Sequence, residues 1–289
     1  MGMIGEMLSY PFLVRALAGG ILVSLCASLL GVSLVLKRYS MIGDGLSHVS
    51  FGALSFAVAF GWSPLRVSVP VVVLAAFFLL RITENGKLKS DAAIAMISAV
   101  ALAAGIIVTS LTTGMTTDVS SYMFGSILAM SREDVRLSVI LSLFVLGLFL
   151  ICYNKIFAVT FDESFARATG VNVSWYNILI AVLTAVTIVL GMRMMGAMLI
   201  SSLIIFPSLT SMRVFKSFHG VVVSSGILSV VCFVIGMMVS YRYSTPAGAS
   251  VVMVNLAAFL IFSGVGYVAR MGRADKKTEY GTAGKEERQ

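Results

Sequence analysis

The chain has 289 residues, of which 58% are apolar and only 12% are charged, and its mean hydropathy is +0.99. A typical water-soluble domain has about a quarter of its residues charged and would have no place for this much apolar surface. The apolar residues come in runs of about 20, long enough to cross a ~30 Å hydrocarbon layer as helices, which excludes a β-barrel of short alternating strands. The composition therefore predicts an all-α, polytopic transmembrane helical bundle.

The apolar windows between charged residues and turn residues predict about nine spans. They cover residues 12–36, 46–62, 64–80, 92–113, 135–157, 174–191, 194–212, 219–241 and 246–269. Only Gly61 to Pro64 separate the second from the third, so the count falls to eight if that pair forms one broken span. We expect residues 1–272 to form the transmembrane permease domain and residues 273–289, which are rich in charged and small side chains, to form a disordered cytoplasmic tail.

The net charge of +8 comes from clusters of Lys and Arg between the apolar runs rather than from one basic patch, so nucleic acid is not an expected partner. Placing residues 37–38, 81–89, 155–167, 213–216 and 270–289 on one side of the membrane collects 15 of the 21 basic residues there. By the positive-inside rule that side is cytoplasmic, which puts the C-terminus inside and, with nine spans, the N-terminus outside. The sequence contains no glycine-rich phosphate loop of the Walker type, so we expect another subunit to hydrolyse any ATP that transport requires.

The most informative polar segment runs from Ser40 to His48, where Asp44 and His48 lie four residues apart and share one helix face. Ionisable side chains close to a membrane-embedded segment are costly and therefore indicate a function. A carboxylate and an imidazole on one face can both bind a zinc or manganese ion. The alternative is structural: Asp44 would cap or charge the start of a helix, and His48 would be a satisfied interior side chain.

Residues 118–126 combine polar and aromatic side chains on the side opposite the basic clusters. The segment contains Asp118, Tyr122, Phe124 and Ser126. It would face a delivery protein or shape an external gate. An amphipathic helix at the headgroup layer, anchored by its aromatic residues, is the alternative.

Residues 161–171 form a short amphipathic stretch on the basic side. Phe161 and Phe165 share a face, and Gly170 suits the C-terminal cap of a helix. Such a helix would dock into a groove on a soluble partner, and a plain connecting loop is the alternative.

The stretch from Gly31 to Gly52, GVSLVLKRYSMIGDGLSHVSFG, strongly resembles the signature region of the permease subunits of ATP-binding-cassette importers for zinc, manganese and iron. Four further stretches follow in the order expected of that family: YMFGSILAMSREDV from Tyr122, FDESFARATGV from Phe161, MGAMLISSLIIFPSLTSMRV from Met195 and STPAGASVV from Ser244. The resemblance therefore covers nearly the whole chain. One departure is Ser126, where many relatives have asparagine.

The resemblance implies a type II importer-like permease in the cytoplasmic (inner) membrane of a prokaryote, a transport subunit that is not itself an enzyme. The implied partners are a second permease subunit, identical or paralogous, two cytoplasmic ATP-binding subunits, an extracytoplasmic metal-binding protein and membrane lipid. The metal is cargo, and no tightly bound cofactor is expected. By position, Asp44 and His48 match the acidic and histidine residues proposed to handle the metal. The helix that couples to the ATPase corresponds to Phe161, Asp162, Glu163, Phe165, Ala166, Arg167 and Gly170.

The predicted function is alternating-access import of a divalent transition metal, zinc or manganese and in some relatives iron, driven by separate ATPase subunits. The alternative is an ion-coupled secondary metal transporter, which the small number of embedded carboxylates disfavours. An intramembrane hydrolase would need a catalytic set on facing helices, and His48 has no second histidine near it in the sequence.

Overall fold

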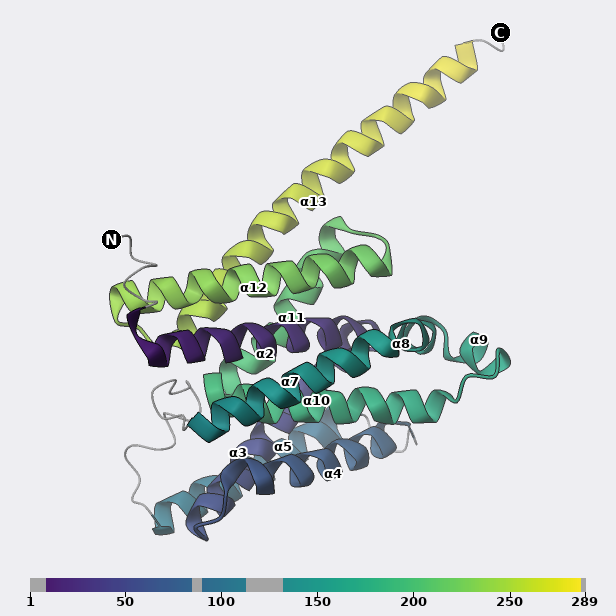
Figure 1. Cartoon of the computed structure of the whole chain (residues 1–289). Helices are drawn as coiled ribbons and strands as arrows, with labels where there is room; N and C mark the ends of the chain where they lie inside the picture. Colours follow the sequence, from purple (N-terminus) through teal and green to yellow (C-terminus); the bar gives the residue numbers. More distant parts are fainter. Residues whose placement is uncertain (1–8, 85–89, 113–131, 287–289) are drawn as a thin grey trace.

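The computed structural model describes residues 9–84, 90–112 and 132–286, and the regular secondary structure in these ranges is helical (Figure 1). The helices are α2 (Pro11–Leu36), α3 (Ser40–Ala59), α4 (Pro64–Glu84), α5 (Ser90–Thr112), α7 (Arg132–Ile151), α8 (Tyr153–Phe161), α9 (Glu163–Ala168), α10 (Val173–Met195), α11 (Ala197–Val214), α12 (Phe218–Tyr243) and α13 (Ala247–Glu286).

Helix α2 is the centre of the bundle and packs against α7, α10, α11 and α12. Small residues allow this close approach. A Cβ atom on Gly31 would lie 2.0 Å from the carbonyl oxygen of Ile204, so only glycine fits where α2 meets α11. On the α12 side, the buried hydroxyl of Ser229 donates a hydrogen bond to the carbonyl oxygen of Ser24 at 2.9 Å. Glycine contacts and serine hydrogen bonds therefore hold α2 to its neighbours.

Helix α3 packs against α4, α5, α10 and α11, and most extensively against α5. Thirteen of its 20 residues are buried. A Cβ atom on Gly52 would lie 2.8 Å from the carbonyl oxygen of Ala101, and one on Gly45 would lie 2.6 Å from the Cγ2 atom of Ile94. Both glycines therefore face α5 at a distance that a larger side chain would prevent.

The prediction of nine spans is not confirmed. Among the described residues, seven helices are long and apolar enough to cross a membrane: α2, α4, α5, α10, α11, α12 and the part of α13 up to Tyr267. An eighth span results if α7 and α8 are counted together, although the chain bends by 69° between them. The predicted span 46–62 corresponds to α3, in which serine, glycine, Asp44 and His48 lower the hydropathy.

The pair proposed from sequence as one broken span consists of two separate helices, since α3 and α4 pack against each other on either side of residues 60–63. The eight-span count therefore arises from the bend after Ile151 and not from the turn at Gly61.

One end of the bundle, here called the α9 end, contains the C-terminal end of α2, the α8 and α9 helices and the beginnings of α10 and α12 (Figure 1). Helix α13 passes Arg213 of α11 at Gly266 and then leaves the bundle at this end (Figure 1). The sequence analysis predicted a disordered tail over 273–289, whereas residues 273–286 continue α13 as a helix. Lys, Glu, Arg and Ala are frequent in this stretch and are good helix formers, a property that the prediction from charged and small side chains did not weigh.

Candidate functional site

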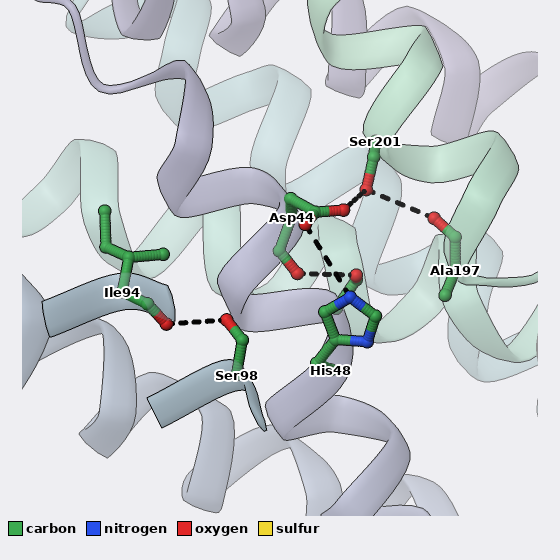
Figure 2. Close-up of polar contacts among 7 residues, drawn as sticks. Asp44, His48, Ile94, Ser98, Ala197 and Ser201 are labelled. Carbon is green, nitrogen blue, oxygen red and sulfur yellow. Dashed lines mark hydrogen bonds and ion pairs between the residues drawn. The ribbon is translucent and has the colours of Figure 1, made fainter. Parts of the chain in front are cut away.

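Asp44 and His48 lie one turn apart on α3 and contact each other, with 3.6 Å between Asp44 Oδ2 and His48 Nε2. The hydroxyl of Ser201 on α11 donates a hydrogen bond to Asp44 Oδ1 at 3.3 Å (Figure 2). The Asp44 side chain is 46% exposed and the His48 side chain 24% exposed, although most of α3 is buried. The pair therefore forms an accessible polar face on a helix that is mostly buried.

The local sequence shows why Asp44 can take this position. Helix α3 begins at Ser40 with Tyr39 as its N-cap residue, and its first turn contains no acidic residue, so the alternative of Asp44 as a helix cap is wrong. Glycines flank the aspartate on both sides. A Cβ atom on Gly43 would lie 3.2 Å from the Cδ1 atom of Ile204, and Gly45 faces α5, so both residues let the backbone around Asp44 approach the neighbouring helices.

The number of ligands limits what this site can bind. Across residues 9–84, 90–112 and 132–286, the structure contains no cluster of three or more His, Cys, Asp or Glu side chains able to hold a metal ion. One chain can offer a carboxylate and an imidazole, with the Ser201 hydroxyl beside them. Zinc takes four ligands in most protein sites, so the two strong ligands of one chain do not complete a zinc site.

Helix α9 forms within the predicted 161–171 stretch, and its own sequence caps both of its ends. At the start, the Asp162 side chain accepts a hydrogen bond from the backbone N–H of Phe165 at 2.9 Å. At the end, Gly170 has a left-handed φ of +81°, and the N–H of Val171 donates to the carbonyl oxygen of Ala166 at 3.0 Å. These caps explain how six residues form a helix.

The two faces of α9 differ. Ala166 is fully buried and packs with Val159 of α8 and Val173 of α10. Phe161, the last residue of α8, and Phe165 of α9 are 68% and 64% exposed. Exposed aromatic side chains at one end of a bundle form a surface that suits a protein partner.

Glu163, by contrast, bonds with Lys37 and Asn177. The Lys37 ammonium lies 2.5 Å from Glu163 Oε1 and 2.6 Å from Asn177 Oδ1, and Asn177 Nδ2 donates to Glu163 Oε1 at 3.3 Å. Burial alone would raise the pKa of Glu163, but the hydrogen bonds from Lys37 and Asn177 and the charges of Lys37 and Arg167 outweigh it, so this pKa lies below its ordinary value. The carboxylate is therefore ionised at neutral pH.

The sequence reasoning missed Ser201, Lys37 and Asn177. Lys37 counted only as a signal of orientation, and its partners lie 126 and 140 residues away in the chain. One local feature of the sequence could have identified Asn177: it is an amide side chain in the second turn of an apolar span. A buried amide needs hydrogen-bond partners, so a contact with another helix was to be expected.

The residues predicted to contact a binding protein or to form an external gate lie outside the described residues. They are Asp118, Tyr122, Phe124 and Ser126.

The fold and these sites define a class of protein: a multi-pass helical membrane permease, a transport subunit rather than an enzyme. Residues 9–266 match the model of the ABC 3 transport family. The match covers most of the chain, so the protein belongs to the ABC 3 transport family and is the permease component of an ATP-binding-cassette importer.

Three similar proteins illustrate the family. The chain is 27% identical to the manganese transport system membrane protein MntC of Halalkalibacterium halodurans, over 89% of this chain and 88% of the relative. It is also 27% identical to the high-affinity zinc uptake system membrane protein ZnuB of Haemophilus influenzae, over 87% of this chain and 97% of the relative. Among solved structures, PsaBC from Streptococcus pneumoniae in complex with Fab matches with a TM-score of 0.81 and 28% identity, over 90% of this chain and 94% of that chain.

Proposed function

We propose that this permease imports a divalent transition metal ion, with zinc and manganese as the expected cargo and ferrous iron as a further candidate. The observation that carries the proposal is the Asp44–His48 pair, which lies on α3 beside the Ser201 hydroxyl of α11. A carboxylate and an imidazole suit zinc and manganese better than copper(I), which prefers sulfur ligands. The names of MntC and ZnuB support the same class of cargo.

A second permease subunit would complete the site. One chain offers two strong ligands, and an equivalent pair from a second subunit would raise the number to four, with the ion held between the subunits. The exposure of the Asp44 carboxylate supports this arrangement, because a carboxylate that faces out of its own chain is available to an ion at an interface. Weak binding by each subunit alone would allow the ion to leave once the subunits move apart.

The α9 end would face the cytoplasm and bind the ATP-hydrolysing subunits through Phe161, Phe165 and Arg167. Lys37, Lys155 and the residues around Arg213 gather at this end, which agrees with the positive-inside rule and would put the C-terminus inside. A metal-binding protein would deliver the ion at the opposite end, where residues 118–126 belong in the sequence-based topology.

The first test compares the metal content of cells that express the permease with its ATPase subunits and its binding protein. Elemental mass spectrometry would measure zinc, manganese and iron in cells with the wild type, His48→Ala or His219→Ala. The chain has two histidines, and His219 is exposed at the α9 end, so its replacement is a matched control. Immunoblotting would verify equal expression.

We expect one metal to rise with the wild type and with His219→Ala and to stay at the background level with His48→Ala. Unchanged content of all three metals in cells where the complex assembles would refute metal import. Uptake that persists when the ATPase subunits are inactivated would instead favour the ion-coupled secondary transporter.

A further inference from the structure

Lys37 is a buried cation where three helices meet. Its side chain is only 6% exposed at the C-terminal end of α2, and Glu163 of α9 and Asn177 of α10 accept its hydrogen bonds at 2.5 and 2.6 Å. Asn177 is 4% exposed and also donates to Glu163. A buried ammonium is costly without an ionic partner, so Lys37 is stabilised by Asn177 and by Glu163, whose side chain is 44% exposed. These three groups are here called the Lys37 node.

The node also lies next to the start of α3. Helix α2 ends in a tight reversal in which Arg38 has a left-handed φ of +61° and the N–H of Tyr39 donates to the carbonyl oxygen of Leu34 at 2.8 Å. Helix α3 follows at Ser40. A hydrogen-bonded turn with a non-glycine residue in the left-handed region has few alternative backbone conformations. Displacement of Lys37 would therefore move the beginning of α3.

Helix α9 has little other attachment to the centre of the bundle. It has six residues, and its buried side chain, Ala166, packs with Val159 and Val173 of the two helices that adjoin it in the chain. Glu163 gives α9 a direct bond to α2. Figure 1 shows α9 beyond the ends of α8 and α10. A partner that moves α9 would therefore act on a short helix that, within residues 9–84, 90–112 and 132–286, is joined to α2 by the ion pair of Glu163 with Lys37.

We propose that Lys37, Glu163 and Asn177 are positioning residues that transmit displacement of α9 to the start of α3, and through it to Asp44 and His48. This inference rests on the proposed function, in which ATPase subunits move α9. Because separation of a buried ammonium from its carboxylate is costly, a displacement of Glu163 also displaces Lys37. The tight turn after Lys37 then transmits this displacement to the start of α3. The competing explanation is that the node only fastens α9.

Amide hydrogen exchange in the purified full-length permease in lipid nanodiscs separates the two explanations without a cargo or a partner. Glu163→Ala removes the carboxylate that links α9 to Lys37, and its neighbour Asp162→Ala removes the N-cap of α9 while the node stays intact. We expect both variants to speed exchange in residues 163–168, and Glu163→Ala alone to speed it at least threefold in residues 40–44. Unchanged exchange in residues 40–44 with Glu163→Ala, or an equal increase with both variants, would overturn the proposal. Glu163→Gln, which retains the hydrogen bonds without the charge, replaces Glu163→Ala if that variant does not fold.

A second measurement tests the consequence for transport. In proteoliposomes with the complete complex, we expect Glu163→Ala to lower the number of metal ions imported per ATP hydrolysed at least fivefold while the ATPase subunits still co-purify. The reversed pair Lys37→Glu with Glu163→Lys should recover a third or more of the wild-type ratio. An unchanged ratio in a wild-type complex that transports metal would refute the node and leave metal import intact. A wild-type complex that moves no metal would refute the proposed function, and the exchange data would still decide the node.

Discussion

Replacement of Gly52 by alanine tests the close packing of α3 against α5, on which the position of Asp44 depends. The new Cβ atom would lie 2.8 Å from the carbonyl oxygen of Ala101, a backbone atom that cannot rotate away. The two helices would have to move apart by about half an ångström, and overpacking of this kind costs about 1–3 kcal/mol. Because the contacted atom is backbone, we expect the upper half of that range. Alanine regains about 1 kcal/mol through its higher helix propensity, which leaves a net loss of about 1–2 kcal/mol.

Gly147→Ala in α7 is the matched control. A Cβ atom on Gly147 meets no heavy atom within 4 Å, so the same substitution should stabilise the protein by up to about 1 kcal/mol. The two variants therefore differ by about 2–3 kcal/mol in the free energy of unfolding. A chain of this length changes its Tm by about 2–4 °C per kcal/mol, so Gly52→Ala should melt about 4–12 °C below Gly147→Ala.

The assay is thermal unfolding of both variants and the wild type in the same detergent, followed by the loss of the monodisperse peak in fluorescence-detected size-exclusion chromatography. We expect the Tm values to rank Gly52→Ala lowest, then the wild type, then Gly147→Ala. If Gly52→Ala melts at or above the wild type, then α3 and α5 are not in contact at Gly52 and the derived geometry of the α3 face is wrong.

Three further predictions concern single polar groups. Ser201→Ala removes one hydrogen bond to Asp44, worth about 1 kcal/mol, and should raise the KM for metal uptake about fivefold with little change in the amount of assembled complex; an unchanged KM would contradict a role for this hydroxyl. Asp162→Ala removes the N-cap of α9 at a cost of about 1 kcal/mol and should weaken binding of the ATPase subunits severalfold in a pull-down titration, whereas equal binding would mean that α9 does not form the docking surface. Because the pKa of Glu163 is lower in the folded protein than in the unfolded chain, its stabilising contribution is present above the ordinary glutamate pKa and is lost as the pH falls through the lowered value. The Tm difference between the wild type and Glu163→Gln should therefore shrink as the pH falls below about 4, and a constant difference would refute this assignment.

The sequence predicted the helical class because apolar runs of spanning length leave no other fold, and each predicted span has a helix at its position. The count of nine spans is not confirmed because α3, which the sequence windows counted as a span, is not among the candidate spans of the described residues. Its 40–59 sequence contains Ser, Gly, Asp and His, which fit a helix surrounded by other helices. The periodicity of the sequence does not reveal which helices pack around a given helix.

The candidate site was predictable only in part. The i, i+4 spacing of Asp44 and His48 follows from local helix geometry, so the sequence alone could pair them. Ser201 is 157 residues from Asp44 in the chain, and only tertiary packing brings its hydroxyl to the carboxylate. The same holds for Lys37, whose position at the end of a span has an ordinary explanation in membrane orientation and gives no sign of a distant carboxylate.

The distribution of burial links the fold to the proposed transport path. In the apolar windows of α5 and α13, 22% of the residues are buried, so these helices present most of their surface to lipid or to a partner subunit. Helix α3 has the opposite character, because its polar groups would be costly in contact with lipid chains. Packing of α3 against α4, α5, α10 and α11 limits that contact, and the Asp44 and His48 side chains remain 46% and 24% exposed on the face that these helices leave open. The low hydropathy that keeps α3 out of the span count is thus the property expected of the helix that lines a path for ions.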